Sequence, residues 1–258
     1  MKFIIYRFYI VEWKHLMLKA ITFDFWQTLY ADSDKNWRKR QAIRVKRCHT
    51  YLSNCGYTCP LTDVEFGLEE AYNLVSSLWH KHRGISVKRC MDRFAEVLQL
   101  QLQDADLDQL IECLGAAFLE APPIIMPYVK PVISRLSKSY PLGIISDSAL
   151  TPGSFARKLM ERDGILQFFT AFTFSDETDY TKPQVVQFHS TLAELNAKPA
   201  EAVHIGDIFR TDIVGAKNAG MKAIRFAGFN KGEGDDILSD AVVDDYRKLE
   251  TTIAELSK

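Results

Sequence analysis

The seven residues LKAITFD, at positions 18–24, form a short apolar run that ends in an aspartate. A run of this length, bounded by polar residues, is typical of a strand buried within a parallel sheet. Comparable runs occur in the second half of the chain, as PLGIISD (141–147), FFTAFTFS (168–175), AVHIGD (202–207) and MKAIRFA (221–227). We predict that all five runs are strands.

Helical stretches separate the later strands, near 152–163, 183–196 and 210–219, and DAVVDDYRKL (240–249) adds a short strand and a helix. Strands that alternate with helices favour parallel pairing through right-handed crossovers. The predicted fold class is therefore α/β, with a doubly wound (Rossmann-like) parallel sheet.

The chain between about 34 and 125 has a helical pattern instead. Apolar residues recur every three or four positions in segments near 35–54, 62–82, 87–102 and 106–120. A hinge and the start of another helix are then marked by Pro122, Pro123, Pro127 and Pro131. We expect an inserted α-helical domain over 34–125, between the two parts of an α/β core at 17–33 and 126–258.

Residues 1–16 precede this pattern. Their apolar run is interrupted by Arg7 and Glu12, is shorter than the roughly 20 residues that span a bilayer, and lacks a small-residue cleavage site. We interpret the segment as an upstream translation start or a loosely attached extension. A weak membrane or partner anchor is the alternative.

The net charge of the 258-residue chain is -1. Without a large basic surplus, neither a nucleic-acid partner nor a membrane partner is expected. The odd number of cysteines and their loose spacing favour a reducing, cytoplasmic compartment. All of them lie in the helical insertion, as Cys48, Cys55, Cys59, Cys90 and Cys113. We interpret them as packing thiols, with a zinc site shared with nearby histidines as the alternative.

Polar side chains mark the ends of three predicted strands. Asp24 ends the first, Ser146 and Asp147 end the second, and Asp207 ends another. Ligands of an open parallel sheet bind at the carboxyl ends of its strands, so these distant residues are expected to converge on one site. One such aspartate could be only a helix cap, but three strand ends together indicate function.

Four short motifs resemble, in order, those of the haloacid dehalogenase-like (HAD) superfamily: FDFWQTL (23–29), IISDS (144–148), TKP (181–183) and IGDIFRTDIVGAKNAGM (205–221). The last is the most specific, because a second aspartate follows Gly-Asp by five residues and GAKNAGM is in register. The insertion after the first motif corresponds to the helical cap of the superfamily's first subclass. The resemblance implies a hydrolase of small phosphorylated molecules, with Asp24 as covalent nucleophile.

The resemblance also implies a cofactor, Mg²⁺, which prefers oxygen ligands. Asp24, the backbone carbonyl of Trp26 and Asp207 would hold it. Asp212 would lie just behind them, as a further or water-mediated ligand.

The remaining assignments concern the phosphoryl group. Ser146, with Asp147 beside it, would bind the phosphoryl oxygens, and Lys182 would neutralise charge on Asp24 and on the substrate. Thr28 would help to position the nucleophile loop. Each has a plainer alternative: Ser146 as a helix cap, Lys182 as an exposed loop residue, and Thr28 as a turn residue.

Trp26 departs from the phosphatase pattern. Phosphatases of the superfamily usually carry an aspartate two residues after the nucleophile, as general acid for the leaving group. Dehalogenases carry an aromatic residue there but lack the acidic Gly-Asp motif, whereas this chain keeps Asp207 and Asp212. We therefore favour hydrolysis of phosphate esters or acyl phosphates. A carbon–halogen or carbon–phosphorus hydrolase, or a non-catalytic binding protein of the same fold, are the alternatives.

The helical insertion would select the substrate. Seven basic residues crowd one stretch of it: Lys35, Arg38, Lys39, Arg40, Arg44, Lys46 and Arg47. They could face an anionic substrate, although a solvated helix face is the more common arrangement. Trp37, Phe66 and Trp79 could line an apolar pocket, although aromatic residues at helical spacing more often belong to a core. We expect a monomer or homodimer.

Overall fold

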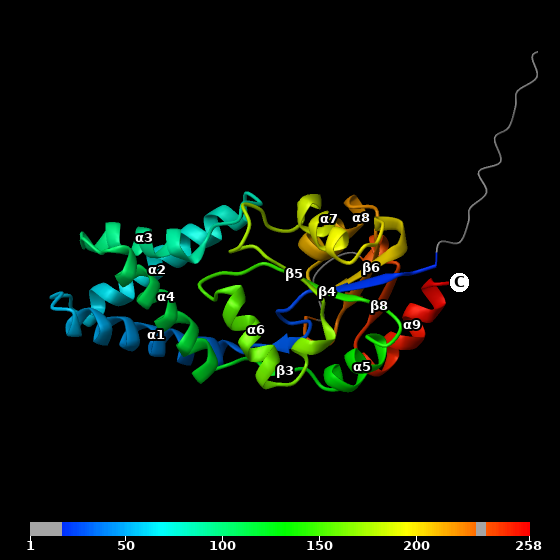
Figure 1. Cartoon of the computed structure of the whole chain (residues 1–258), viewed down its shortest axis with the longest axis horizontal. Helices are drawn as coiled ribbons and strands as arrows, with labels where there is room; N and C mark the ends of the chain where they lie inside the picture. Colours follow the sequence, from blue (N-terminus) through cyan, green and yellow to red (C-terminus); the bar gives the residue numbers. More distant parts are fainter. Residues whose placement is uncertain (1–16, 231–235) are drawn as a thin grey trace, which may run out of the picture.

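The computed structural model describes residues 17–230 and 236–258 (Figure 1). The expected extension at 1–16 lies outside the described residues. A six-stranded parallel sheet forms the centre of the molecule, in the order β5-β4-β1-β6-β7-β8. Its strands are β1 (Ala20–Phe23), β4 (Leu142–Ser146), β5 (Ala171–Phe174), β6 (Ala202–Gly206), β7 (Lys222–Phe226) and β8 (Ala241–Val243). The predicted α/β fold is confirmed.

Strand β1 lies inside the sheet, paired with β4 on one side and β6 on the other. Ala20, Ile21 and Phe23 are fully buried, as expected for a strand covered by helices on both faces. This order brings the carboxyl ends of β1, β4 and β6 next to one another.

Helices cover both faces of the sheet (Figure 1). One face carries α7 (Val185–Glu194) and α8 (Val214–Asn218), which pack through an apolar cluster that includes Phe188. The other carries α5 (Val129–Leu136), α6 (Gly153–Arg162) and α9 (Leu249–Leu256), packed through a larger cluster.

Four helices form a separate bundle to the left of the sheet in Figure 1. They are α1 (Asp34–Asn54), α2 (Leu61–Trp79), α3 (Val87–Leu98) and α4 (Asp104–Glu120). The bundle has its own apolar cluster, which contains the buried thiols of Cys48 and Cys90, and all five cysteines are free. A short antiparallel ribbon, β2 (Tyr30–Ala31) with β3 (Ile124–Ile125), joins it to the sheet.

Several boundaries differ from the sequence prediction. The strand predicted at 168–175 begins only at Ala171, because Leu166–Phe168 form a 3₁₀ turn. The helix predicted to reach residue 82 ends at Trp79, and a turn with His82 at φ 57° follows. The helix predicted at 210–219 begins as a π-helical turn, Phe209–Ile213. Such turns at helix ends leave little trace in hydrophobic periodicity.

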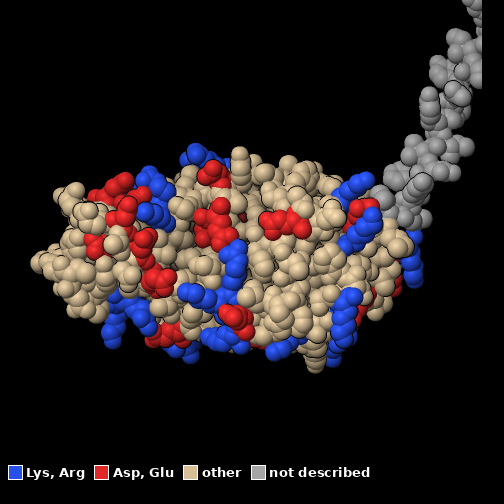
Figure 2. Space-filling view, viewed as in Figure 1, with Lys and Arg blue, Asp and Glu red and all other residues tan. Residues whose placement is uncertain are grey.

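Charges of both signs are interspersed over the face shown in Figure 2, without a broad basic or acidic field. No described helix combines the length and the apolar character that a bilayer crossing requires.

Candidate active site

Three aspartates meet at the carboxyl ends of the central strands. Asp24 follows β1 and Asp207 follows β6, while Asp212 lies in the turn after β6. One carboxylate oxygen from each lies within 4.8 Å of the other two, and all three side chains are buried. The convergence expected from the strand ends is therefore present.

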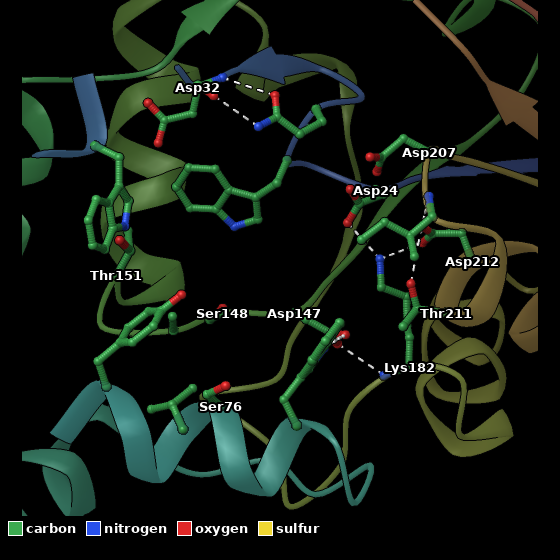
Figure 3. Close-up of a pocket in the computed structure, with 18 of the residues that line it drawn as sticks. Asp24, Asp32, Ser76, Asp147, Ser148, Thr151, Lys182, Asp207, Thr211 and Asp212 are labelled. Carbon is green, nitrogen blue, oxygen red and sulfur yellow. Dashed lines mark hydrogen bonds and ion pairs between the residues drawn. The ribbon is translucent and has the colours of Figure 1, made fainter. Parts of the chain in front are cut away.

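Lys182 lies between two of these carboxylates. Its Nζ donates to Asp24 Oδ1 and to Asp212 Oδ1, each at 2.6 Å (Figure 3). The side chain is only 2% exposed, which excludes the plainer expectation of an exposed loop lysine. Burial alone would lower the pKa of Lys182, but Asp212, Asp24 and Asp147 outweigh it and raise that pKa above its ordinary value.

The carboxyl groups respond differently to this crowding. Burial raises the pKa of Asp24 to about 7, opposed by Lys182 and reinforced by Asp212. Burial, together with the charges of Asp24 and Asp212, raises the pKa of Asp207 to about 8. Burial would also raise the pKa of Asp212, but Lys182 and His204 reverse the direction and lower it. Asp212 is thus the firmly ionised partner of Lys182.

Asp212 is held in place by its neighbours. The backbone N–H of Ile208 donates to Asp212 Oδ2 at 3.0 Å, and His204 Nε2 lies 3.2 Å from Oδ1. A Cβ on Gly206 would lie 2.3 Å from Asp212 Cγ, so only glycine fits there. His204 is not among the predicted site residues, and its only signal in the sequence is a polar residue inside the apolar run AVHIGD.

Asp207 has two side-chain partners. Thr28 Oγ1 donates to Asp207 Oδ1 at 3.5 Å, and Asn230 Nδ2 donates to Oδ2. Thr28 is fully buried and acts on the site through Asp207. Asn230 follows β7 in a loop that carries no recognisable pattern, so its contact with Asp207 was not predictable from the sequence.

Ser146, at the end of β4, and Asp147, which follows it, have different surroundings. Ser146 is buried, and its Oγ has no hydrogen-bond partner among the described residues. Asp147 uses both carboxylate oxygens: Oδ1 accepts from the backbone N–H of Lys182 at 3.0 Å, and Oδ2 accepts from Trp79 Nε1 at 2.7 Å. Asp147 therefore connects the Lys182 loop to the bundle.

A cavity of about 370 Å³ lies between the sheet and the bundle (Figure 3). The sheet side contributes Asp24, Asp147, Lys182, Asp207 and Asp212, and the bundle side contributes Trp37, Arg40, Arg44, Tyr72 and Trp79. Trp37 and Trp79 thus line a pocket, while Phe66 is 54% exposed and does not line this cavity.

Trp26 also lines the cavity. Its ring packs edge-on against Phe25 and Phe118, with centroids 5.1 and 5.8 Å away. An indole cannot serve as the proton donor that an aspartate at this position would supply.

The residues present suit a divalent cation with oxygen ligands. When ionised, Asp24, Asp207 and Asp212 carry three negative charges, and Lys182 offsets one of them. Two buried negative charges then remain within a few ångströms of each other and repel one another. A bound dication would neutralise both.

The chain is similar to known proteins over most of its length. A family model, haloacid dehalogenase-like hydrolase, matches residues 18–220. A glyceraldehyde 3-phosphate phosphatase of Methanothermobacter thermautotrophicus is 30% identical over 244 residues, which is 90% of this chain and 98% of the relative.

Two solved structures share the fold. A 2-haloacid dehalogenase from Pseudomonas syringae pv. Tomato superposes with a TM-score of 0.67 at 22% identity, covering 93% of this chain and 99% of the other. A HAD phosphatase from Thermococcus onnurineus gives 0.60 at 21% identity, covering 91% and 97%.

Proposed function

The chain belongs to the haloacid dehalogenase-like hydrolase family, and we propose that it is a Mg²⁺-dependent phosphatase of small molecules. In the proposed reaction, Asp24 attacks the phosphorus of a phosphate ester or acyl phosphate. A bond forms between the Asp24 oxygen and phosphorus, and the bond to the leaving-group oxygen breaks. Water then hydrolyses the aspartyl phosphate and restores the carboxylate.

One observation carries this proposal: a buried ammonium contacts the nucleophile and the Asp212 carboxylate at 2.6 Å, beside a third carboxylate. Asp24, Asp207, the Trp26 carbonyl and Asp212 are the proposed metal ligands, and a bound Mg²⁺ would neutralise charge on the phosphoryl oxygens. Lys182 would hold Asp24 in place and stabilise the same charge. The unpartnered hydroxyl of Ser146 is available to a phosphoryl oxygen.

The direct test is Asp24→Asn, which keeps the shape of the side chain and removes the nucleophile. We expect at least about a thousandfold loss of turnover, measured with Mg²⁺ on a panel that includes p-nitrophenyl phosphate, acetyl phosphate and glyceraldehyde 3-phosphate. Asp108→Asn, on the exposed side of α4, is the matched control. Equal turnover by Asp24→Asn and the unaltered protein would refute the proposal.

A second candidate rests on Trp26, whose aromatic ring lines the cavity where a phosphatase has its acid. A hydrolase of carbon–halogen bonds needs no proton donor for the leaving halide. Metal-independent release of chloride from 2-chloropropionate would favour this candidate. Its absence, with Mg²⁺-dependent phosphate release, would exclude it.

A further inference from the structure

The bundle brings buried positive charge to the cavity. Helix α1 carries the seven basic residues of the stretch 35–47, and five of them are exposed. Arg40 and Arg44 instead are 2% and 3% exposed and line the cavity. Burying a guanidinium costs desolvation free energy unless an opposite charge pairs with it. The partners of each arginine therefore indicate whether its charge is satisfied within the protein or is suited to a ligand.

Arg40 is fully engaged within the protein. It forms an ion pair with Asp32 and donates to the carbonyl of Ala121 at 3.0 Å. Its guanidinium also lies over the rings of Trp26 and Phe118, 5.8 and 5.5 Å from their centroids. These contacts explain its burial without a ligand.

Arg44 is different. Its terminal nitrogens donate to Leu150 O at 2.9 Å, to Thr151 Oγ1 at 2.7 Å and to Gln41 Oε1 at 3.4 Å. All three acceptors are neutral. Arg44 Nε has no hydrogen-bond partner, and among the described residues no carboxylate forms an ion pair with this side chain.

The charge of Arg44 persists at neutral pH. Burial, reinforced by the nearby Arg40, lowers the pKa of Arg44 to about 9, so the guanidinium is still protonated at pH 7. It is thus a buried cation whose contacts within the protein leave its charge poorly compensated.

The hydrogen bond from Arg44 to Thr151 shows where Arg44 lies in the cavity. Thr151 lies on the side of the cavity opposite Asp24, Lys182 and Asp207 (Figure 3). The poorly compensated cation of Arg44 is therefore remote from Asp24, within the same 370 Å³ space.

We propose that Arg44 binds a second anionic group of the substrate, a carboxylate or a second phosphate, while the first phosphate lies at Asp24. The inference rests on the proposed function and narrows its substrates to molecules that carry a second anionic group besides the phosphate that is removed. A guanidinium presents donors in a fork that matches either oxyanion, and a cavity near the lower end of the usual range suits a small molecule.

The first test uses the unaltered protein. Glyceraldehyde 3-phosphate and 3-phosphoglycerate differ only in an aldehyde against a carboxylate. Propane-1,3-diol monophosphate and bisphosphate differ only in a second phosphate. In at least one pair, we expect kcat/KM to be about tenfold or more higher for the member with two anionic groups. The pair that shows this preference identifies the anion. No preference in either pair would overturn the inference.

The second test changes the residue. Arg44→Gln should lower that preference about 10- to 100-fold, as expected for hydrogen bonds to a charged group, and Arg44→Lys should lower it less because the charge remains. Arg47→Gln, on the same helix but exposed and paired with Glu120, should preserve the preference. Circular dichroism checks that the variants fold. A preference retained in Arg44→Gln would overturn the inference.

A binding measurement separates this inference from the proposed function. In isothermal titration calorimetry of the Asp24→Asn protein with Mg²⁺, 3-phosphoglycerate should bind more tightly than glyceraldehyde 3-phosphate, or the bisphosphate more tightly than the monophosphate. The additional Arg44→Gln change should remove the difference. If no ester is turned over, the proposed function fails, yet this difference would still support the subsite. Equal binding, or none, would refute it.

Discussion

Lys182 contacts two buried carboxylates at once, Asp24 and Asp212. Because Asp212 is the firmly ionised member, it anchors the ammonium and leaves Asp24 available for the proposed attack. His204 supports Asp212 from behind, and Thr22 Oγ1 lies 2.9 Å from His204 Nδ1. The orientation of the lysine is thus set by residues that lie within the strands.

Trp26, two residues after Asp24, predicts how turnover depends on the leaving group of the substrate. Since Trp26 supplies no proton, an alkoxide leaving group must depart without the roughly 10²- to 10⁴-fold help that a general acid gives. Aryl and acyl phosphates, whose leaving groups are more stable as anions, should react faster than alkyl phosphates by about that factor. Steady-state kinetics on a series of phosphate esters of graded leaving-group pKa checks this. Equal rates across the series would indicate another proton donor in the cavity.

Helix α2 ends where it joins the bundle to the loop that carries Lys182. Trp79, its last residue, donates to Asp147, which also accepts from the backbone of Lys182. Just beyond, Gly84 N–H donates to Asp179 O at 3.0 Å and Gln184 donates to His82 O at 2.7 Å. The end of α2 and the loop before α7 therefore form one connected unit.

Trp79→Phe tests the importance of this connection, because it keeps an aromatic ring and removes one hydrogen bond to a carboxylate. We expect kcat/KM for phosphate esters to fall about 10- to 100-fold, with the secondary structure unchanged by circular dichroism. Trp37→Phe makes the same change in another cavity-lining tryptophan, whose indole has no hydrogen bond to the sheet domain among the described residues. A loss no greater than that of Trp37→Phe would contradict a special role for the Trp79–Asp147 bond.

The site exists only in the assembled molecule, since its parts come from β1, β4, β6, the loop before α7 and the bundle. Ligands that bind only the folded state raise its stability by mass action. Asp24, Asp207 and Asp212 carry excess negative charge when they are ionised, so we expect a divalent cation that binds them to stabilise the whole chain.

Mg²⁺ at ten times its Kd should stabilise the protein by about 1.4 kcal/mol, which corresponds to a rise in Tm of about 3–6 °C for a chain of this size. Differential scanning fluorimetry with and without MgCl₂ measures the shift, with NaCl at equal ionic strength as control. Asp207→Asn should abolish most of it, whereas Asp108→Asn should retain it. A similar shift in Asp207→Asn would place the cation elsewhere.

The sequence determined the sheet and which side chains meet at the candidate site. LKAITFD and the later apolar runs predict buried parallel strands because only a strand covered on both faces is apolar at nearly every position. Since such strands end at one edge, the convergence of Asp24 and Asp207 followed from their positions. The ordered motifs then identified Lys182 and Asp212.

Tertiary structure decided what the bundle contributes. Arg44 and Arg47 are three positions apart on one helix, yet one lines the cavity and the other is exposed; periodicity alone did not reveal which face of α1 turns inward. Trp79, the last residue of α2, reaches Asp147, and Asn230 reaches Asp207 through a loop without a pattern. Helix-face orientation and loop paths depend on contacts between distant segments, and a local sequence pattern does not contain them.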